Sequence, residues 1–251
     1  MASRFINFEQ AAESLRGKSI AVVGSAPSVL DNAPGFIDSH DIVVRVNNYK
    51  TGAAQGTLCD VHYSFYGTSI RKRAEDLQAD GVQLCMCKCP NARALESAWH
   101  EANNKINGID FRYIYHNRKD WWFTDTFIPS VEHFLRGFEL LGKHIPTTGF
   151  SAILDVLACE PGSVYLTGFD FFTSGLHNVD EAWKPGNPND PICHRPDLEM
   201  AWLRKNLHKH PVSFDKKLGD MLVQNPLPPG EGRVGERSLT SILSRGERRQ
   251  T

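Results

Sequence analysis

The sequence lacks any apolar stretch of the roughly 18 to 20 residues that a bilayer-spanning helix needs. Its first residues also lack the apolar core of a secretory signal, so we expect a cytoplasmic protein. It has no large excess of positive charge, with 28 Lys and Arg against 29 Asp and Glu, whereas a nucleic-acid-binding domain should be clearly basic. These absences argue against membrane-spanning, secreted and nucleic-acid-binding classes.

The six cysteines do not form the paired CxxC knuckles of a structural zinc site. Cys85, Cys87 and Cys89 alternate along one expected strand, so their side chains share a face. Adjacent thiols can ligate a metal, but without a second knuckle we expect reduced, buried thiols and no metal site.

Short apolar runs alternate with helical patterns, which predicts an α/β fold: a single Rossmann-like domain with a mainly parallel sheet flanked by helices. The expected strands are residues 20–23, 42–46, 61–65, 82–87, 111–115 and 164–167. The expected helices are residues 69–78, 92–103, 130–141, 151–158 and 196–208. A chain of 251 residues can form such a core without disulfides or metal ions.

The chain divides into three expected parts. Residues 1–17 form a short amphipathic helix, residues 18–225 form the main domain, and residues 226–251 form a disordered tail rich in Pro, Gly and charge. Within the main domain, residues 173–193 are crowded with Gly, Pro, Asn and Asp and have no periodicity, which predicts a working loop or lid.

The first expected strand runs directly into the small-residue turn Gly24-Ser25-Ala26-Pro27-Ser28. At such a turn, an α/β fold lets backbone N–H groups approach a phosphate. Gly24 permits the close approach, Ser25 offers a hydroxyl, and Pro27 suits the first turn of a helix. The turn matches neither GxGxxG nor the Walker loop, so a nucleotide site and simple turn geometry both remain open.

Polar residues interrupt and follow the second expected strand. Arg45 lies within an otherwise apolar run, and because a buried unpaired guanidinium is costly, we expect Asp38 or Asp41 to pair with it. Asn47 stands at the carboxyl end of the strand, where open α/β sheets bind ligands. Its amide can bond to a ribose, a base or a phosphate, or it can cap a turn.

These segments resemble the motifs of sialyltransferases, especially glycosyltransferase family 29. The large motif is similar to residues 21–24 and 37–47, and the small motif to Pro146-Thr147-Thr148-Gly149, Cys159 and residues 165–169. The very small motif, His-x4-Glu, is similar to residues 194–199. The family's first turn contains an Asn where this chain has Ser25, and the turn looks more like the G-x-G-P-S turn of family 42.

The resemblance implies a GT-A-like sialyltransferase variant that moves a sialic acid or Kdo-like 2-ulosonic acid from CMP-sialic acid or CMP-Kdo to a glycan or glycolipid hydroxyl. It implies direct, inverting displacement with no metal and no cofactor beyond the donor substrate. The implied donor-binding residues are Gly24, Ser25, Ala26, Pro27, Asn47, Thr147, Thr148, Gly149, Phe169 and Asp170, and the implied catalytic residues are His194 and His177.

His194 is the candidate general base. Pro196 marks a helix start, so His194 lies just before the positive end of a helix, which favours the neutral, proton-accepting ring. The plain alternative is a surface histidine at a helix cap. Glu199 is expected to cap the first turn or to pair with Arg45 or Arg195.

Further roles are expected at the edges of this site. Thr147 or Thr148 can cap the following helix, with Gly149 allowing close approach to a phosphate or carboxylate. His177, in the expected lid, can donate to the leaving phosphate. Trp121 and Trp122 are candidate acceptor contacts, although aromatic clusters more often belong to the core.

Two other classes of function stay open. A phosphotransferase or pyrophosphokinase would need metal-binding carboxylates, for which Asp60 and Asp170 are the candidates. A non-catalytic sensor would bind CMP or a glycan without turnover. The basic run 71–73 is consistent with a solvated helix start or with peripheral contact with an anionic membrane surface, which for a bacterial enzyme of lipopolysaccharide or capsule synthesis would be the inner face of the cytoplasmic membrane.

Overall fold

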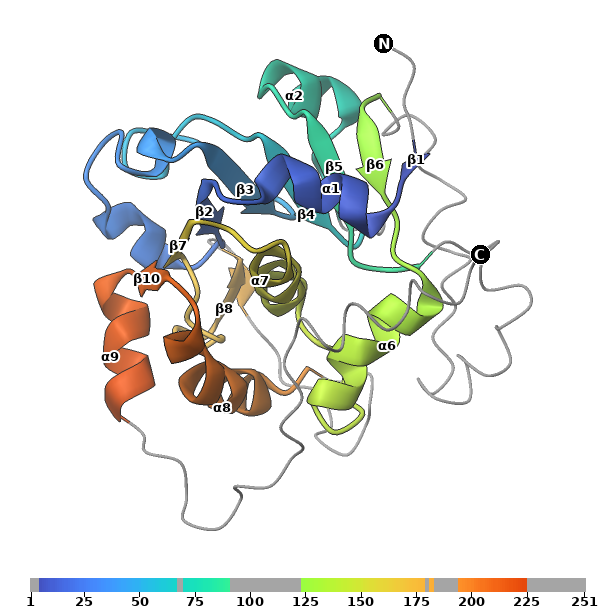
Figure 1. The fold of residues 1–251 in the computed structure, drawn as a ribbon. Helices are drawn as coiled ribbons and strands as arrows, with labels where there is room; N and C mark the ends of the chain where they lie inside the picture. The colour runs from blue at the N-terminus through green and yellow to red at the C-terminus, as the bar shows by residue number, and fades with distance from the viewer. Residues whose placement is uncertain (1–4, 67–69, 91–122, 179–180, 183–193, 225–251) are drawn as a thin grey trace.

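The computed structural model describes residues 5–66, 70–90, 123–178, 181–182 and 194–224. Its centre is an eight-stranded sheet in the order β1-β6-β5-β4-β3-β2-β7-β10, in which all neighbours are parallel (Figure 1). The strands are β1 (Phe5–Ile6), β2 (Ser19–Val23), β3 (Ile42–Val46), β4 (Val61–Ser64), β5 (Leu84–Cys87), β6 (Asp125–Phe127), β7 (Ser163–Thr167) and β10 (Val212–Phe214). An antiparallel pair joins β8 (Leu176–Asn178) to β9 (Glu181–Ala182). The predicted α/β fold with a mainly parallel sheet is confirmed.

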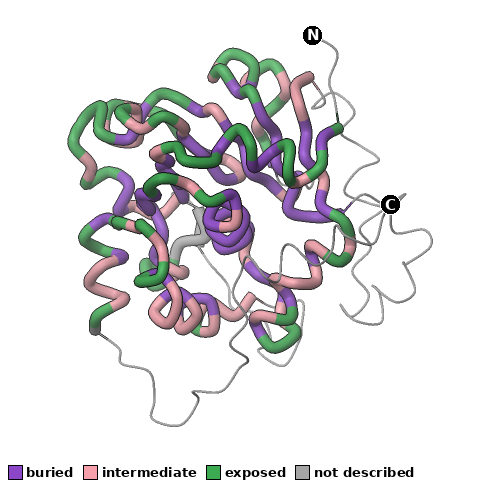
Figure 2. The backbone as a smooth tube through the Cα atoms, viewed as in Figure 1, coloured by how far each residue is buried: buried purple, intermediate pink, exposed green. Residues whose placement is uncertain are grey.

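Helices cover both faces of this sheet (Figure 1). They are α1 (Phe8–Leu15), α2 (Ala74–Ala79), α6 (Val131–Leu140), α7 (Thr148–Ala158), α8 (Pro196–Asn206) and α9 (Lys216–Gln224), with 3-10 turns η1 (Pro27–Asp31), η2 (Ile37–Ser39) and η4 (Leu207–Lys209). Helix α7 is buried along nearly its whole length (Figure 2) and packs against β3, β4 and α1. Its largely apolar sequence reflects this central position.

Alternate residues of the central strands enter two different cores. Ile20 and Val22 of β2 pack in the core that contains α1 and α7. Ala21 and Val23 face the opposite side, where they pack with Val29 of η1 and with η2. Burial on both faces explains why these strands read as continuous apolar runs.

The chain changes direction across the sheet between β2 and β7. After β2 the chain adds β3, β4 and β5 on one side, and much later β7 pairs with the other side of β2. Crevices at the carboxyl ends of strands flanking such a reversal are where open α/β sheets bind ligands. The turns that follow β2 and β7 therefore occupy the expected location of a site.

Most strand predictions are confirmed, with changes at the ends. The strand predicted at 61–65 ends at Ser64, and the strand predicted at 82–87 begins at Leu84. Strands β1, β6 and β10 were not predicted, because two or three residues carry too little periodicity to be recognised. The strand predicted at 111–115 and the helix predicted at 92–103 lie outside the described residues.

Helix ends differ from the predictions where capping side chains decide them. Helix α2 begins at Ala74 rather than at residue 69, because Arg73 is extended and its N–H donates to Asp76. Helix α7 begins at Thr148 rather than at residue 151, because Thr147 caps it. Helix α8 ends at Asn206 and continues as a 3-10 turn, and α9 was not predicted.

The described cysteines are buried, as expected. Cys85 and Cys87 lie on one face of β5 in a core with Leu77 of α2, and Cys89 lies in a neighbouring core. Among the residues that the structure describes, no helix has both the length and the apolar character needed to cross a membrane. The predicted tail and most of the predicted loop at 173–193 lie outside these residues.

Candidate functional site

The turns after β2 and β7 are joined by backbone hydrogen bonds. The N–H of Gly24 donates to Thr167 O at 2.8 Å, and that of Ala26 donates to Gly168 O at 2.9 Å. A Cβ atom on Gly24 would lie 2.2 Å from Gly168 O, so no side chain fits there. Gly168 itself has a positive φ of 73°, which favours glycine. The close approach predicted for Gly24 is therefore made, in this structure, to the chain's own backbone.

The ring of Phe169 connects this pair of turns to the start of α7. A Cβ atom on Gly24 would lie 3.1 Å from Phe169 Cδ1, and one on Gly149 would lie 2.8 Å from Phe169 Cε1. Both glycines therefore leave room for the same buried ring. Three segments that the sequence analysis assigned separately to the donor (24–27, 147–149 and 169–170) thus meet around Phe169.

Two backbone N–H groups at the start of α7 have no acceptor among the described residues. Thr147 is the N-cap, and its hydroxyl accepts from the N–H of Phe150 at 3.1 Å, as the sequence predicted. The N–H groups of Thr148 and Gly149 donate to no described residue. A helix N-terminus with unused N–H groups suits an anion such as a phosphate.

Glu199 holds the cap residue from the opposite side. Its carboxylate accepts from Thr147 N at 2.5 Å and from Thr147 Oγ1 at 2.8 Å, and the side chain is fully buried. The expected pairing of Glu199 with Arg45 or Arg195 is wrong: Arg195 pairs with Asp197 at 2.5 Å, and Arg45 lies on β3. Helix α8 places Glu199 in its first turn facing inward, so it binds the N-cap residue of a neighbouring helix rather than capping its own helix.

The buried carboxyl of Glu199 makes stability depend on pH. Burial raises the pKa of Glu199 to about 7 from 4.5, although the hydrogen bonds from Thr147 oppose the rise. The folded state thus binds the proton of the Glu199 carboxyl more tightly than the unfolded chain does. The protonated carboxyl therefore contributes fully to the free energy of unfolding below about pH 4.5, and this contribution is lost as the pH rises to about 7. At 1.36 kcal/mol per pH unit, the loss is about 3 kcal/mol.

We expect a Glu199→Gln variant to lack this dependence. Burial lowers the pKa of His62 from 6.5 to about 4, so the contribution of His62 to stability increases as the pH rises. This contribution is the same in wild type and in the variant, so it cancels when the two proteins are compared. Urea denaturation at pH 5 and pH 8 should therefore show wild type losing about 2–3 kcal/mol relative to the variant. Glu139→Gln, at an exposed position on α6, is the control. If the difference in free energy of unfolding between wild type and Glu199→Gln is the same at pH 5 and at pH 8, the prediction is contradicted.

His194 lies just before α8, as predicted from Pro196. Its Nδ1 is 2.9 Å from the carbonyl oxygen of Ile145. A carbonyl oxygen can only accept, so Nδ1 carries a proton, and in the neutral ring Nε2 is the basic nitrogen. His194 and Glu199 thus contact Ile145 and Thr147, on either side of Pro146.

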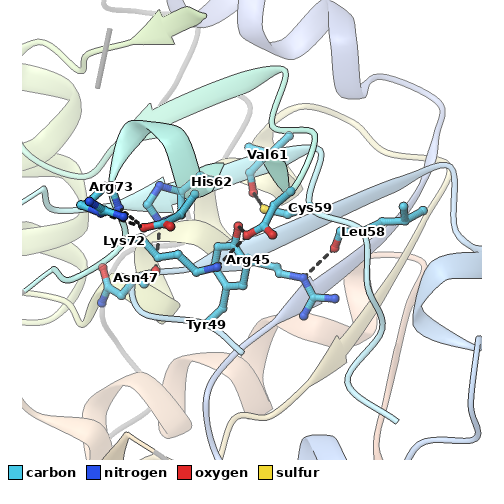
Figure 3. A network of polar contacts seen from close by, with 11 residues as sticks. Arg45, Asn47, Tyr49, Leu58, Cys59, Val61, His62, Lys72 and Arg73 are labelled. Atoms are coloured by element: carbon cyan, nitrogen blue, oxygen red, sulfur yellow. Dashed lines mark hydrogen bonds and ion pairs between the residues drawn. The ribbon is translucent and has the colours of Figure 1, made fainter. Parts of the chain in front are cut away.

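Asn47 follows β3 in a left-handed conformation with φ of 52°, held by β4. His62 Nε2 lies 2.9 Å from Asn47 O (Figure 3). Ser64 Oγ donates to Asn47 Oδ1 at 3.0 Å. Because burial keeps His62 neutral, Nε2 donates this bond and Nδ1 faces the Tyr66 hydroxyl at 3.1 Å. The Nδ2 amide of Asn47 donates to no described residue.

Arg45 is fully buried, but its predicted ion pair is absent among the described residues. Its Nε donates to Leu58 O at 2.6 Å (Figure 3). Its Nη2 donates to Gln55 O at 2.8 Å, and its guanidinium carbon lies 5.5 Å from the centroid of the Tyr49 ring. Asp38 instead accepts from the backbone of residues 57 and 58, and Asp41 from Ser19. Carbonyl oxygens thus replace the expected carboxylate.

The two carboxylates considered as metal ligands have local structural partners. Asp170 is buried and accepts from the N–H groups of Phe172 and Ser174, folding a loop in which Phe171 and Phe172 both have positive φ. Asp60 accepts from Val43 N at 2.8 Å. Within the described ranges, no three His, Cys, Asp or Glu side chains form a group that could hold a metal ion.

Sequence reasoning missed Asp215, which holds both turns together. Its Oδ2 accepts from Ser28 Oγ, Thr167 Oγ1 and Gly168 N at 2.9–3.0 Å, and its Oδ1 accepts from Leu218 N at 2.8 Å. Asp215 therefore links the turn after β2, the end of β7 and the start of α9. An Asp just before a helical pattern is an N-cap signal, but the long-range contacts leave no local signature.

Other predicted residues fall at the edge of the described structure or beyond it. Ser25 and Pro27 lie in the turn after β2, with Pro27 at the first position of η1 as predicted. His177 belongs to β8, but its side chain is not described. Trp121 and Trp122 lie outside the described residues, so their expected acceptor contacts stay predictions. In the basic run, Lys72 pairs with Asp80 at 2.6 Å.

A parallel eight-stranded sheet flanked by helices, with glycine turns packed together at its strand reversal, places this chain in the class of open α/β folds. No family model matches the sequence, and neither does any curated protein. A mammalian sialyltransferase in complex with Gal-beta-1-3GalNAc-ortho-nitrophenol is similar in fold, with TM-score 0.55, 18% identity, and coverage of 83% of this chain and 72% of that chain.

Two further solved structures are similar. A second mammalian sialyltransferase structure has TM-score 0.54 and 20% identity, covering 80% of this chain and 69% of that chain. The sialyltransferase CstII from Campylobacter jejuni has TM-score 0.46 and 14% identity, covering 79% of this chain and 80% of that chain. This chain has the fold of the two mammalian sialyltransferases.

Proposed function

We propose that this chain is a metal-independent, inverting glycosyltransferase that moves a sialic acid or Kdo-like 2-ulosonic acid from a CMP-activated donor to a glycan hydroxyl. The observation that carries the proposal is the convergence of three motif segments around Phe169, with His194 beside them at Ile145. Their order follows glycosyltransferase family 29, with a first turn like that of family 42. The mammalian sialyltransferase of similar fold is complexed with a glycan compound, which supports a glycan acceptor.

The donor phosphate is assigned to the start of α7. The unused N–H groups of Thr148 and Gly149 offer two donors to an anion, and the helix dipole adds to the attraction. Asn47, at the end of a neighbouring strand, offers its Nδ2 amide to the cytidine or ribose. Glu199 contributes indirectly, because it fixes Thr147, the cap of this helix.

The reaction requires a proton acceptor for the attacking hydroxyl and stabilisation of the departing phosphate. As the acceptor oxygen bonds to the anomeric carbon, its proton passes to His194 Nε2. The bond from that carbon to the phosphate oxygen breaks, and its electron pair leaves with CMP. The hydrogen bond from Nδ1 to Ile145 O orients the ring and supports the positive charge that it gains. Direct displacement inverts the anomeric configuration.

A donor screen tests this proposal. We expect nucleotide release and sugar transfer with CMP-sialic acid or CMP-Kdo in the presence of EDTA, and none with UDP-sugars. CMP should raise the melting temperature of the protein, and UDP should raise it less. Absence of CMP binding would contradict the proposal. Magnesium-dependent consumption of ATP would indicate the phosphotransferase alternative, and CMP binding without turnover of any CMP-sugar would indicate a sensor.

A further inference from the structure

A cavity lies between α6, α7 and the end of β5, and its described lining does not include Thr148 or Gly149, the residues assigned to the donor phosphate. We call it the α6–α7 cavity. Its polar lining consists of Tyr63, Lys88, His133, Arg136, Ser151 and Asp155, and the remaining lining is apolar apart from Gly137. Nothing in the proposed transfer reaction uses these side chains.

Lys88 is the unusual member of this lining. It follows β5, where its backbone N–H donates to Ser64 O at 2.9 Å, and only 7% of the residue is exposed. Among the described residues, no oxygen accepts a hydrogen bond from its Nζ, and no carboxylate lies within ion-pair distance. Burial lowers the pKa of Lys88, which reflects the cost of an ammonium group without a counter-ion.

The carboxylate inside the cavity is already committed to other donors. Tyr63 donates its hydroxyl to Asp155 Oδ2 at 2.6 Å, and His133 Nε2 lies 2.8 Å from Asp155 Oδ1. Both carboxylate oxygens of Glu199 bind Thr147. Glu199 therefore interacts with the Lys88 ammonium group electrostatically but accepts no hydrogen bond from it. Among the described residues, Lys88 therefore lines the cavity without a hydrogen-bonded carboxylate partner.

The remaining charges also favour an anion. Arg136 also lines the cavity. Its Nη2 lies 4.0 Å from Oε1 of Glu132, whose side chain is largely exposed. Among the described residues of the lining, two basic side chains, Lys88 and Arg136, thus face one carboxylate, that of Asp155. Leu140 and Leu154 supply an apolar wall that suits the carbon skeleton of a small ligand.

We propose that the α6–α7 cavity binds a carboxylate or phosphate group carried by the acceptor, with Lys88 as its principal contact. Pro146 lines the cavity, and its two neighbours in the chain contact His194 and Glu199. The cavity therefore borders, at Pro146, the segment that contacts the proposed base. Assignment to the acceptor rests on the proposed function, whereas binding of an oxyanion does not.

Calorimetric titration of the full chain, saturated with CMP, tests the site. The probes are N-acetylneuraminic acid and its neutral methyl ester, and galactose 6-phosphate and galactose. We expect one acidic probe to bind at least about tenfold more tightly than its neutral counterpart, as is typical of a charge-assisted contact. Tighter binding of N-acetylneuraminic acid than of its methyl ester identifies a carboxylate ligand. Tighter binding of galactose 6-phosphate than of galactose identifies a phosphate ligand.

Variants separate Lys88 from general effects of charge. Lys88→Met should bind the acidic and neutral probes equally and should melt no lower than wild type, because it removes an unpaired buried charge. Lys88→Arg should retain part of the preference, and Lys217→Met, at an exposed position on α9, should retain all of it.

Two results would overturn the inference. One is equal binding of acidic and neutral probes by wild type, and the other is an undiminished preference in Lys88→Met. CMP binding is measured in the same proteins. Intact CMP binding with no acidic preference refutes the cavity assignment alone, whereas absent CMP binding refutes the proposed function.

Discussion

A His194→Ala variant is expected to turn over about 10²–10⁴-fold more slowly than wild type, the range typical for loss of a positioned general base. CMP binding should be unchanged, because the two N–H groups assigned to the phosphate belong to α7 and not to His194. Initial rates with saturating CMP-sugar measure the first effect, and the CMP-dependent rise in melting temperature measures the second.

The control for this experiment keeps the contact that His194 makes. His194→Asn places an amide N–H where Nδ1 donates to Ile145 O, but it offers no basic nitrogen. It should therefore be as slow as the Ala variant while melting like wild type. His208→Ala, at an exposed position on η4, should be fully active. Wild-type turnover by either His194 variant would remove the proposed mechanism.

A Gly24→Ala variant should lose both stability and CMP binding. The added Cβ would lie 2.2 Å from Gly168 O, a contact with backbone that no rotamer change relieves. Separating the two turns breaks the bonds from Gly24 to Thr167 and from Ala26 to Gly168. We expect a loss of about 1–3 kcal/mol or more in the free energy of unfolding, together with loss of the CMP-dependent melting shift.

Gly52→Ala is the matched control for that variant. A Cβ atom there would meet only the flexible side-chain oxygen of Gln55, at 3.1 Å, and Gly52 does not have a positive φ. Its stability and its response to CMP should be close to those of wild type. If Gly24→Ala melts and binds CMP as this control does, the paired turns do not shape the donor site.

The sequence predicted those parts of the fold and site that have local signatures. The apolar runs of β2, β3 and β7 mark buried parallel strands, and Thr147 and Pro196 mark helix starts through capping and a fixed φ. The family-like order of the motifs pointed to segments that the structure brings together around Phe169.

Contacts between distant segments could not be predicted in this way. The partners of Arg45 are backbone carbonyls, which no residue type reveals. Glu199 binds Thr147, the N-cap residue of α7, which lies 52 positions earlier in the chain. Asp215 binds Ser28, which lies 187 positions earlier. Such pairings depend on how strands are ordered in the sheet, and periodicity along one segment carries no information about that order.

The pairing of β2 with β7 has a consequence for how the protein is made. The two strands are neighbours in space, yet residues 19–23 leave the ribosome long before residues 163–167, and Asp215 follows later still. Nascent chains that end before β7 therefore expose one edge of β2 and lack the paired turns. Contacts between residues so far apart in the sequence slow folding, so we expect the paired turns to form late in folding, after β7 has been synthesised.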